Sequence, residues 1–483
     1  MIKRFYATKD NTITNAFEEN LVTRGTGSNM GAADVLEVFS IFGQQSSGSA
    51  ELSRVLIEFN PDFSQVPSSG VSWYLKMFNA PHSQTVPSNF TITVSAISQS
   101  WEEGYGIDMD YYGDLTNGRA GSNWIQARQS SSADDGKWTT IGGDYRSDYV
   151  ATANFSTGLE DLEVNVSNIV NQWSSSAWTN YGFGVQLTSS QETYFSSSTG
   201  TNTATELHNI NGSQKSFFTK KFFGRDSEFH FQKPVLEARW DSARKDDRGY
   251  FYASSSLASA TDNLNTLYLY NRIRGRLRDI PTPPTSASLR ASATGANLYN
   301  AAVTRDSTGI YEADLFLNTT ASTLFDVWWV SGSSGITAYH TGTIDVKSFA
   351  AAGYNPEDTY VLSMPSLRKQ YRKKQTHRLN LYVREKNWSP NIHTQAVRSS
   401  IPSLIIPSAS FQLRRSIDDY VVVPYGTGST SHTGLSYDVS GNYFDLDTTY
   451  LESGYLYDVQ YSFYDEENGW EEQPYRFKFR VVD

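Results

Sequence analysis

Apolar and polar side chains alternate along several segments of this chain, and a period of two is typical of β-strands with one buried face. The alternation is clearest over Leu267–Leu277, Tyr311–Leu317 and Leu379–Val383. Near the end, Tyr455–Phe463 and Tyr475–Val481 alternate on either side of an Asn468-Gly469 pair. Because Asn-Gly favours the tight turn of a hairpin, we predict a terminal β-hairpin with one apolar and one polar face.

A spacing typical of an α-helix stands out between Asp161 and Trp173. Val166, Ile169, Val170 and Trp173 fall at i, i+3, i+4 and i+7, so a helix would place them in one apolar stripe. We therefore expect one short helix and less than about a tenth of the chain in helix, against roughly 30–35% in an average soluble protein. The pattern as a whole predicts an all-β chain.

The composition agrees with this pattern and narrows the possible functions. Aromatic residues, which favour pleated surfaces, make up 14% of the 483 residues, and charged residues only 19%. The formal net charge of −11 argues against a general nucleic-acid-binding role. The absence of cysteine excludes disulfides and thiolate metal sites. Polar sequence follows the first residues, so we expect no secretory signal, no membrane span and folding in the cytoplasm of the producing cell.

Two places interrupt the alternation and suggest domain boundaries. Pro281, Pro283 and Pro284 lie close together, and proline cannot donate to a sheet ladder, which indicates a linker. The stretch Ala350–Pro356 also breaks the pattern, which restarts after it. Serine, threonine and glycine are frequent between Ser196 and Gly212, which indicates a long loop inside the first domain.

Short landmark segments follow one another along the first half of the chain. They are Ala7–Ile13, Leu52–Phe59, Trp101–Gly104, Asn123-Trp124, Val164–Trp173, Asn180–Val185, Phe223–Ser227 and Lys233–Trp240. In this order they resemble the DNRLRE family, whose fold is a β-sandwich of the carbohydrate-binding-module type. The resemblance implies a jelly-roll-like sandwich over residues 1–245.

Further landmarks lie in the second half of the chain. They are Leu267–Asp279, Leu324–Trp329, Thr341–Ile344 and Thr433–Asp447. These segments resemble the downstream part of virion structural proteins of contractile-tailed marine cyanophages, which implies a role in the particle without saying where. We expect residues 246–283 to form a connector strand and proline-rich linker, 284–352 a small immunoglobulin-like sandwich, and 353–483 a C-terminal β domain.

Residue patterns typical of catalysis or metal binding are absent from the sequence. None of the seven histidines lies in a helical pair with metal-ligand spacing or flanks a Gly-x-Ser-x-Gly turn. In Glu102-Glu103 and Glu471-Glu472 the adjacent carboxylates would point to opposite faces of a strand, although carboxylates from distant segments could still meet. Asp108–Asp114 resembles half of a calcium loop, but Arg119 occupies the position of the bidentate acid. We predict no enzymatic activity, no cofactor and no metal site.

Aromatic residues cluster between Trp101 and Tyr145. Trp101 and Trp124 lie in the segments that resemble the family signature, so we expect them in the core. The remaining aromatics could also be buried, or they could stack on sugar rings. The candidate glycan-contacting residues are Tyr105, Tyr111, Tyr112 and Trp138.

Four arginines recur at every second position in one alternating segment: Arg272, Arg274, Arg276 and Arg278. If the segment is one strand, all four lie on one face, and such like charges repel unless acids face them. The acids could lie on a neighbouring strand of this chain. Alternatively, the arginines could dock on an acidic surface of a neighbouring subunit, since guanidinium groups bind carboxylates bidentately.

These observations favour a structural component of a tailed bacteriophage virion, placed in the neck or collar, in the tail, in a baseplate accessory position or at the base of a fibre. Its partners would be other virion structural proteins and further copies of itself in a symmetric assembly, without direct contact to membrane or nucleic acid. The alternative is a carbohydrate-binding adhesin or receptor-binding protein that contacts host surface glycans.

Overall fold

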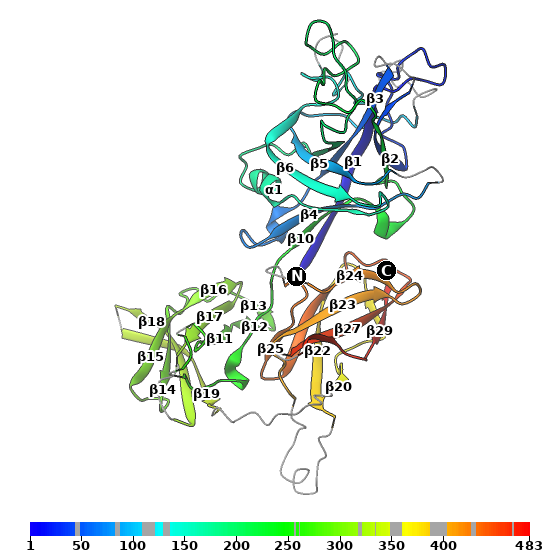
Figure 1. Cartoon of the computed structure of the whole chain (residues 1–483). Helices are drawn as coiled ribbons and strands as arrows, with labels where there is room; N and C mark the ends of the chain where they lie inside the picture. Colours follow the sequence, from blue (N-terminus) through cyan, green and yellow to red (C-terminus); the bar gives the residue numbers. More distant parts are fainter. Residues whose placement is uncertain are drawn as a thin grey trace. The chain divides into compact units, whose positions relative to one another are not determined.

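The computed structural model shows a chain with 48% of its residues in strands and 4% in helix. The described residues are 1–43, 49–82, 87–108, 121–128, 136–255, 257–259, 261–316, 321–333, 335–347, 360–386, 403–426, 431–465 and 468–483. The prediction of an all-β chain with little helix is confirmed (Figure 1). The expected boundary at Ala350–Pro356 lies outside the described residues.

The chain divides into two compact units, Ile2–Trp240 and Asp241–Asp483, with Met1 assigned to the second. In the first unit the strands are β1 (Ile2–Thr14), β2 (Val35–Phe42), β3 (Ala50–Phe59), β4 (Ser72–Met77), β5 (Phe90–Ile97), β6 (Tyr145–Phe155), β7 (Leu162–Asn165), β8 (Phe183–Leu187), β9 (Phe217–Phe223) and β10 (Val235–Arg239). They form one sheet in the order β6-β5-β8-β3-β1-β10-β4-β7, and β2 pairs with both β3 and β9. Because the end strands β6 and β7 also lie close to each other, the sheet is nearly closed.

Strand β1 joins two sections of this sheet. Its first residues, Ile2–Tyr6, pair with β10, and Ala7–Thr14 pair with β3. The register shifts between Ala7 and Lys9, so Thr8 is unpaired in the ladder and its hydroxyl donates to the carbonyl of Glu58. A bulge of this kind bends a strand, so that its two halves can pair in two different sections of the sheet. The polar network described below lies at this bend.

The expected helix is present and shorter than the predicted window. Helix α1 spans Ser167–Ser174 and buries Ile169, Val170 and Trp173, so the predicted apolar stripe is confirmed. The residues before it form β7, because Leu162 and Val164 alternate with polar neighbours and pair with β4. Two 3₁₀ turns, η2 (Phe63–Gln65) and η4 (His230–Gln232), complete the helical elements described in this unit.

The second unit begins with η5 (Asp247–Gly249) and a sandwich. Its strands are β11 (Asn265–Tyr270), β12 (Arg272–Ile273), β13 (Arg276–Leu277), β14 (Ser286–Arg290), β15 (Asn297–Ala302), β16 (Thr304–Ser307), β17 (Ile310–Leu315), β18 (Thr323–Gly332) and β19 (Gly335–Asp345). The sheets β11-β17-β16 and β15-β14-β18-β19 enclose a core that includes Leu267, Leu289, Tyr311 and Trp328. β12 and β13 form a separate two-stranded hairpin.

The predicted connector over 246–283 is wrong, because this segment belongs to the sandwich. β11 pairs along its whole length with β17, and Leu267 is fully buried in the shared core. The prolines at 281–284 connect β13 to β14 inside one domain, and Pro284 is buried. Proline marked a break in the ladder correctly, but the break is a loop between the two sheets and not a linker between domains.

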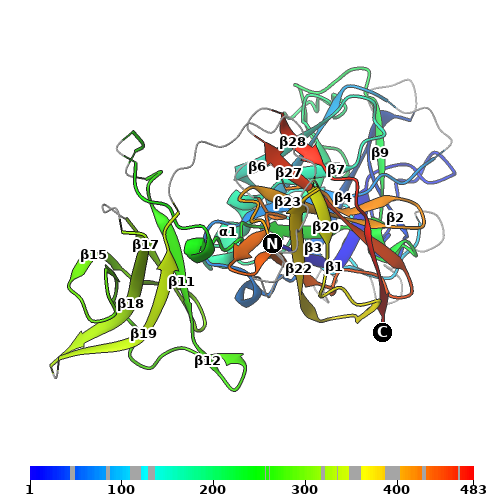
Figure 2. The ribbon, with the colours of Figure 1, turned by 90° about the horizontal axis from the view of Figure 1, so that it is seen from below.

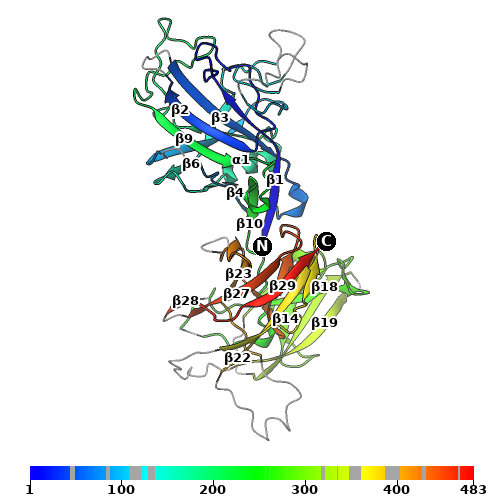
Figure 3. The same ribbon diagram turned by 90° about the vertical axis from the view of Figure 1, so that its right-hand side faces the viewer.

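The same unit ends with a second sandwich. Its strands are β20 (Tyr360–Ser363), β21 (Gln370–Arg372), β22 (Thr376–Glu385), β23 (Ala409–Arg415), β24 (Tyr420–Val423), β25 (Ser436–Asp438), β26 (Gly441–Asp447), β27 (Leu456–Asp465), β28 (Gly469–Glu472) and β29 (Phe477–Val482). The sheets are β20-β22-β26-β25 and β21-β29-β27-β23-β24, with β28 beside β27 (Figure 3).

The predicted terminal hairpin corresponds to two separate strand pairs, both of which involve β27. The turn at Asn468-Gly469 joins β27 to β28, whereas the later strand β29 pairs with the first half of β27. The apolar face is buried as expected, with Tyr457, Tyr461 and Phe479 in the core.

Candidate functional site

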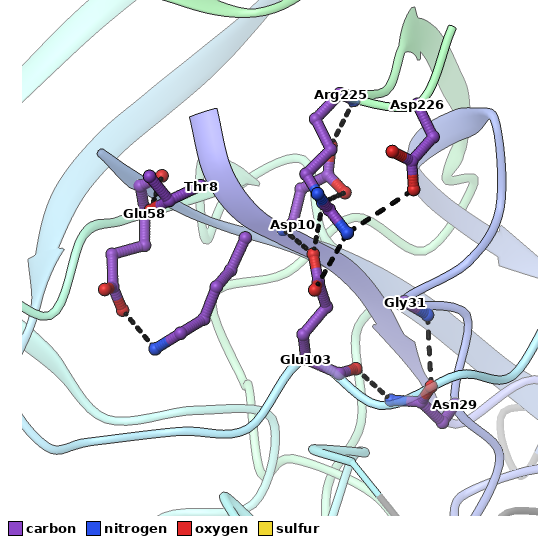
Figure 4. A network of polar contacts seen from close by, with 9 residues as sticks. Thr8, Asp10, Asn29, Gly31, Glu58, Glu103, Arg225 and Asp226 are labelled. Carbon is purple, nitrogen blue, oxygen red and sulfur yellow. Dashed lines mark hydrogen bonds and ion pairs between the residues drawn. The ribbon is translucent and has the colours of Figure 1, made fainter. Parts of the chain in front are cut away.

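Three segments far apart in the sequence meet in a polar network at the bend of β1 (Figure 4). The backbone N–H of Asp10 donates to Oε1 of Glu103 at 2.8 Å, and the N–H of Arg225 donates to Oδ2 of Asp10 at 2.6 Å. The guanidinium of Arg225 binds both carboxylate oxygens of Glu103, at 2.7 and 3.1 Å. Three segments far apart in sequence are thereby tied together.

Burial changes the proton affinity of this network. Asp10 is almost completely shielded from solvent, and burial raises the pKa of its carboxyl to about 7, although the N–H and charge of Arg225 act in the opposite direction. Glu103 adds a second negative charge nearby, which raises the pKa of Asp10 further. The guanidinium of Arg225 lies close to both carboxylates, with Nε 2.7 Å from Oε1 of Glu103 and 4.0 Å from Oδ1 of Asp10.

Asn29 lies at the centre of the same region. Its amide donates to the carbonyls of Glu103 and Ser122, at 2.6 and 2.9 Å, and its Oδ1 accepts the N–H groups of Gly31 and Gly106. A Cβ on Gly104, which has a φ of +83°, would overlap the Asn29 amide. Glycine is required there because the backbone approaches this side chain so closely. The loop that begins at Trp101 is thus fixed at its base.

Three tryptophans of the aromatic cluster between Trp101 and Tyr145 are core residues. Trp101 and Trp124 are buried, as predicted, and their indole N–H groups donate to the carbonyls of Tyr181 and Thr205. Trp138 is also buried, with 4% exposure, and its N–H donates to the carbonyl of Asn123. The prediction of Trp138 as a glycan contact is therefore wrong. Its place in the core could not be told from the sequence, where it resembles any other aromatic residue of the cluster.

The remaining glycan candidates have different outcomes. Tyr105 is 74% exposed on the loop that the Asn29 network fixes. Tyr111 and Tyr112 lie outside the described residues. One of the four candidates is therefore accessible to a ligand in the described part of the chain.

The arginine segment does not form one strand. Arg274 and Gly275 have positive φ values of 53° and 78° and make the turn of the β12–β13 hairpin. Arg272 pairs with Leu277 and Ile273 pairs with Arg276, so Arg272 and Arg276 lie on opposite faces. The predicted placement of all four arginines on one face is wrong, because the turn reverses the chain in the middle of the pattern. We call residues 271–279 the arginine hairpin (Figure 2).

All four arginines of this hairpin are exposed, and so is Ile273, by 54%. Among the residues that the structure describes, none of the four guanidinium groups has an ion-pair or hydrogen-bond partner. Arg305 in the same sandwich behaves differently and binds Asp279 at 3.0 Å. A Cβ on Gly275 would meet open space. The interpretation that acids of this chain neutralise the arginines finds no support in the described residues.

The residue ranges that the structure describes contain no group of three or more His, Asp or Glu side chains that could hold a metal ion. No helix found there has the length and apolar character needed to cross a membrane.

Comparisons with known proteins add little to this picture. No protein-family model and no curated protein matches the chain. Among solved structures, a titin fragment aligns with 50% of this chain and 95% of its own, at 9% identity and a TM-score of 0.15. A titin immunoglobulin tandem covers 42% of this chain and 82% of its own, at 10% identity and a TM-score of 0.15. Tandem immunoglobulin repeats of Dlar cover 45% of this chain and 89% of their own, at 10% identity and a TM-score of 0.15. Likenesses this weak carry no argument about function, so the two family resemblances stay predictions.

Proposed function

We propose that this chain is a structural component of a tailed bacteriophage virion and acts through protein–protein contacts. Its place would be the neck or collar, the tail, a baseplate accessory position or the base of a fibre. The observation that supports the proposal best is the arginine hairpin, in which four exposed cations have no partner among the described residues. Exposed guanidinium groups on a hairpin are suited to bidentate pairing with the carboxylates of a neighbouring protein.

The chain is also suited to a mechanical role. Each described domain is a β-structure with a buried core, and buried ion pairs such as Arg4–Glu237 at 2.7 Å and Arg248–Asp326 at 2.7 Å join distant segments. A single hairpin contact is small, but a symmetric particle repeats it many times, so weak contacts add to a stable assembly.

The test is the incorporation of Arg274→Ser/Arg276→Ser protein into particles assembled in infected cells. We expect the isolated variant to melt almost unchanged, since neither side chain has a partner within the part of the chain that the structure describes. Incorporation should fall by about tenfold or more, because each desolvated interface pair that is broken strands a partner charge. Arg290→Ser/Arg476→Ser is the matched control, which removes two charges from elsewhere in the same unit. Normal incorporation of the hairpin variant would contradict the proposal.

A carbohydrate-binding adhesin is the second candidate, and one observation favours it. Tyr105 exposes 74% of its surface next to Ile107, which is 51% exposed, on a loop with a rigid base. An exposed aromatic ring on a fixed loop can stack on a sugar. A glycan array with the wild-type chain and with Tyr105→Ala separates the two functions, since binding that depends on Tyr105 would favour the adhesin.

A further inference from the structure

Strands β2 and β9 of the first unit lie side by side and share one outward face (Figure 3). The segment Val35–Ile41 pairs antiparallel with Phe217–Phe223 residue by residue. Leu36, Val38 and Phe222 point into the unit, since each is at most 1% exposed. The residues that alternate with them therefore point outward. We call these outward-pointing residues of the two segments the β2–β9 face.

Apolar side chains occupy both ends of this face. At one end Ile41 lies directly opposite Phe217, which is 62% exposed. At the other end Val35 lies opposite Phe223, and the ring of Phe229, which is 50% exposed, packs against Phe223 with 5.5 Å between centroids. Exposed apolar side chains that gather on one face mark interaction sites.

The centre of the face carries one charge of each sign. Glu37 lies directly opposite Lys221, with 3.5 Å between Oε1 and Nζ, and the hydroxyl of Thr219 donates to the same Oε1 at 3.2 Å. The side chains of Glu37 and Lys221 remain 32% and 24% exposed. A partner that covers this face must therefore match an acid and a base side by side.

A second copy of the chain meets this requirement. A two-fold axis between the two strands and parallel to them lays each strand over the other strand of the second copy. Each residue then meets the cross-strand partner of its own equivalent. Glu37 meets Lys221 of the second copy, and the reverse contact forms by symmetry. At the two ends, Ile41 and Val35 each meet a phenylalanine, so the arrangement matches charges and apolar side chains at once.

We propose that two copies of this chain form a two-fold symmetric dimer through the β2–β9 face. The contact is isologous, because both copies use the same surface. Sheets that pack face to face lie about 10 Å apart, a space that interdigitating side chains of this size fill. The inference goes beyond the proposed function, since this face contains none of the hairpin arginines.

The experiment measures the dimer dissociation constant of the full chain by sedimentation velocity over a range of concentrations. Glu37→Lys and Lys221→Glu should each weaken dimerisation by about tenfold or more, because each sets like charges against each other at two equivalent places. The matched controls are Glu385→Lys and Lys374→Glu, which change exposed charges of the second unit. They should dimerise like the wild type.

Phe39→Lys tests the apolar part of the contact. Phe39 is half-buried and lies opposite Thr219 on the outward face, so the variant should stay folded by circular dichroism and lose the dimer. Ile417→Lys, at a position 78% exposed in the second unit, is its control and should dimerise normally. If Phe39→Lys fails to fold, the charge variants decide.

Mixing the two charge variants gives the sharpest result. Each contact between a Glu37→Lys copy and a Lys221→Glu copy again joins opposite charges, so the mixture should dimerise more tightly than either variant alone. A mixture no tighter than its components would overturn the proposal. Charge variants that dimerise like the wild type, or a wild type that is monomeric at every concentration, would overturn it as well.

Discussion

The ion pair between Arg248 and Asp326 allows a quantitative test of the corrected domain assignment. Arg248 lies in η5, in the segment that the sequence pattern assigned to a connector, and Asp326 lies in β18 of the sandwich. Two hydrogen bonds of 2.7 Å join the guanidinium to the carboxylate, and the indole N–H of Trp328 donates to the same carboxylate at 2.8 Å. The side chain of Asp326 is 0% exposed. These contacts attach the segment to the sandwich.

Replacing Arg248 with alanine should leave the buried carboxylate without its cation. Burial opposes ionisation of Asp326, but the hydrogen bonds and charge of Arg248 outweigh this and hold its pKa below the usual value. Removing one partner of a buried pair costs about 3–5 kcal/mol. In a unit of this size that corresponds to a fall in Tm of roughly 10 °C for the transition of the second unit.

Differential scanning calorimetry of the full chain measures this shift. The control is Arg305→Ala, because the Arg305–Asp279 pair is on the surface, with side chains 51% and 46% exposed. Surface pairs contribute about 0.2–1 kcal/mol, so the control should shift Tm by only a few degrees. Adding Asp326→Asn to Arg248→Ala should restore part of the loss, since the stranded charge is removed. A shift for Arg248→Ala no larger than that of the control would refute the assignment of this segment to the sandwich.

Three further predictions concern the first unit, each measured by urea denaturation. Arg4 and Arg239 hold the pKa of buried Glu237 at about 2 against the opposing effect of burial. The contribution of Glu237 to the free energy of unfolding is therefore complete above pH 4.5 and is lost as pH falls toward about 2. Glu237→Gln should remove this dependence of stability on acid pH. The pKa of Asp10 is raised to about 7, so its effect on stability runs in the opposite direction. The free energy of unfolding should fall as pH rises from 3.8 through about 7. Asp10→Asn should make stability less dependent on pH in this range. Gly104→Ala should cost about 1–3 kcal/mol, because alanine combines a positive φ with a clash against Asn29, whereas the same change at exposed Gly200 should cost less.

Local sequence patterns predicted whether a segment forms a strand or a helix, but they did not predict which strand it pairs with. The alternation at Leu267 and Leu269 correctly indicated a strand, because one face of β11 is buried. The pattern did not reveal that β17 is its partner, since pairing is set by contacts about forty residues away along the chain. This is why the sequence pattern places an edge strand of the sandwich in a connector.

The arginine hairpin shows where periodicity misleads. A period of two continues through Arg274-Gly275 in the sequence, yet both residues adopt positive φ and reverse the chain. Gly275 was the available signal, because glycine commonly occupies such turn positions. The chemistry of the segment was recognisable from its composition, whereas the division of its charges between two faces required the backbone geometry.

The polar network could not be derived from local spacing. Asp10, Glu103 and Arg225 are separated by more than 90 residues at each step, and their individual types are common on protein surfaces. Only their meeting at the bend of β1 explains why these segments carry acids, glycines and an arginine. The geometry gives these segments a physical role in holding a loop.

A density map of an intact particle with this subunit located tests the central claim most directly. The account predicts that residues 271–279 are covered by an acidic surface of a neighbouring subunit, with arginine side chains against carboxylates. Particles in which the arginine hairpin points into solvent at every copy would contradict the claim that this chain docks through it.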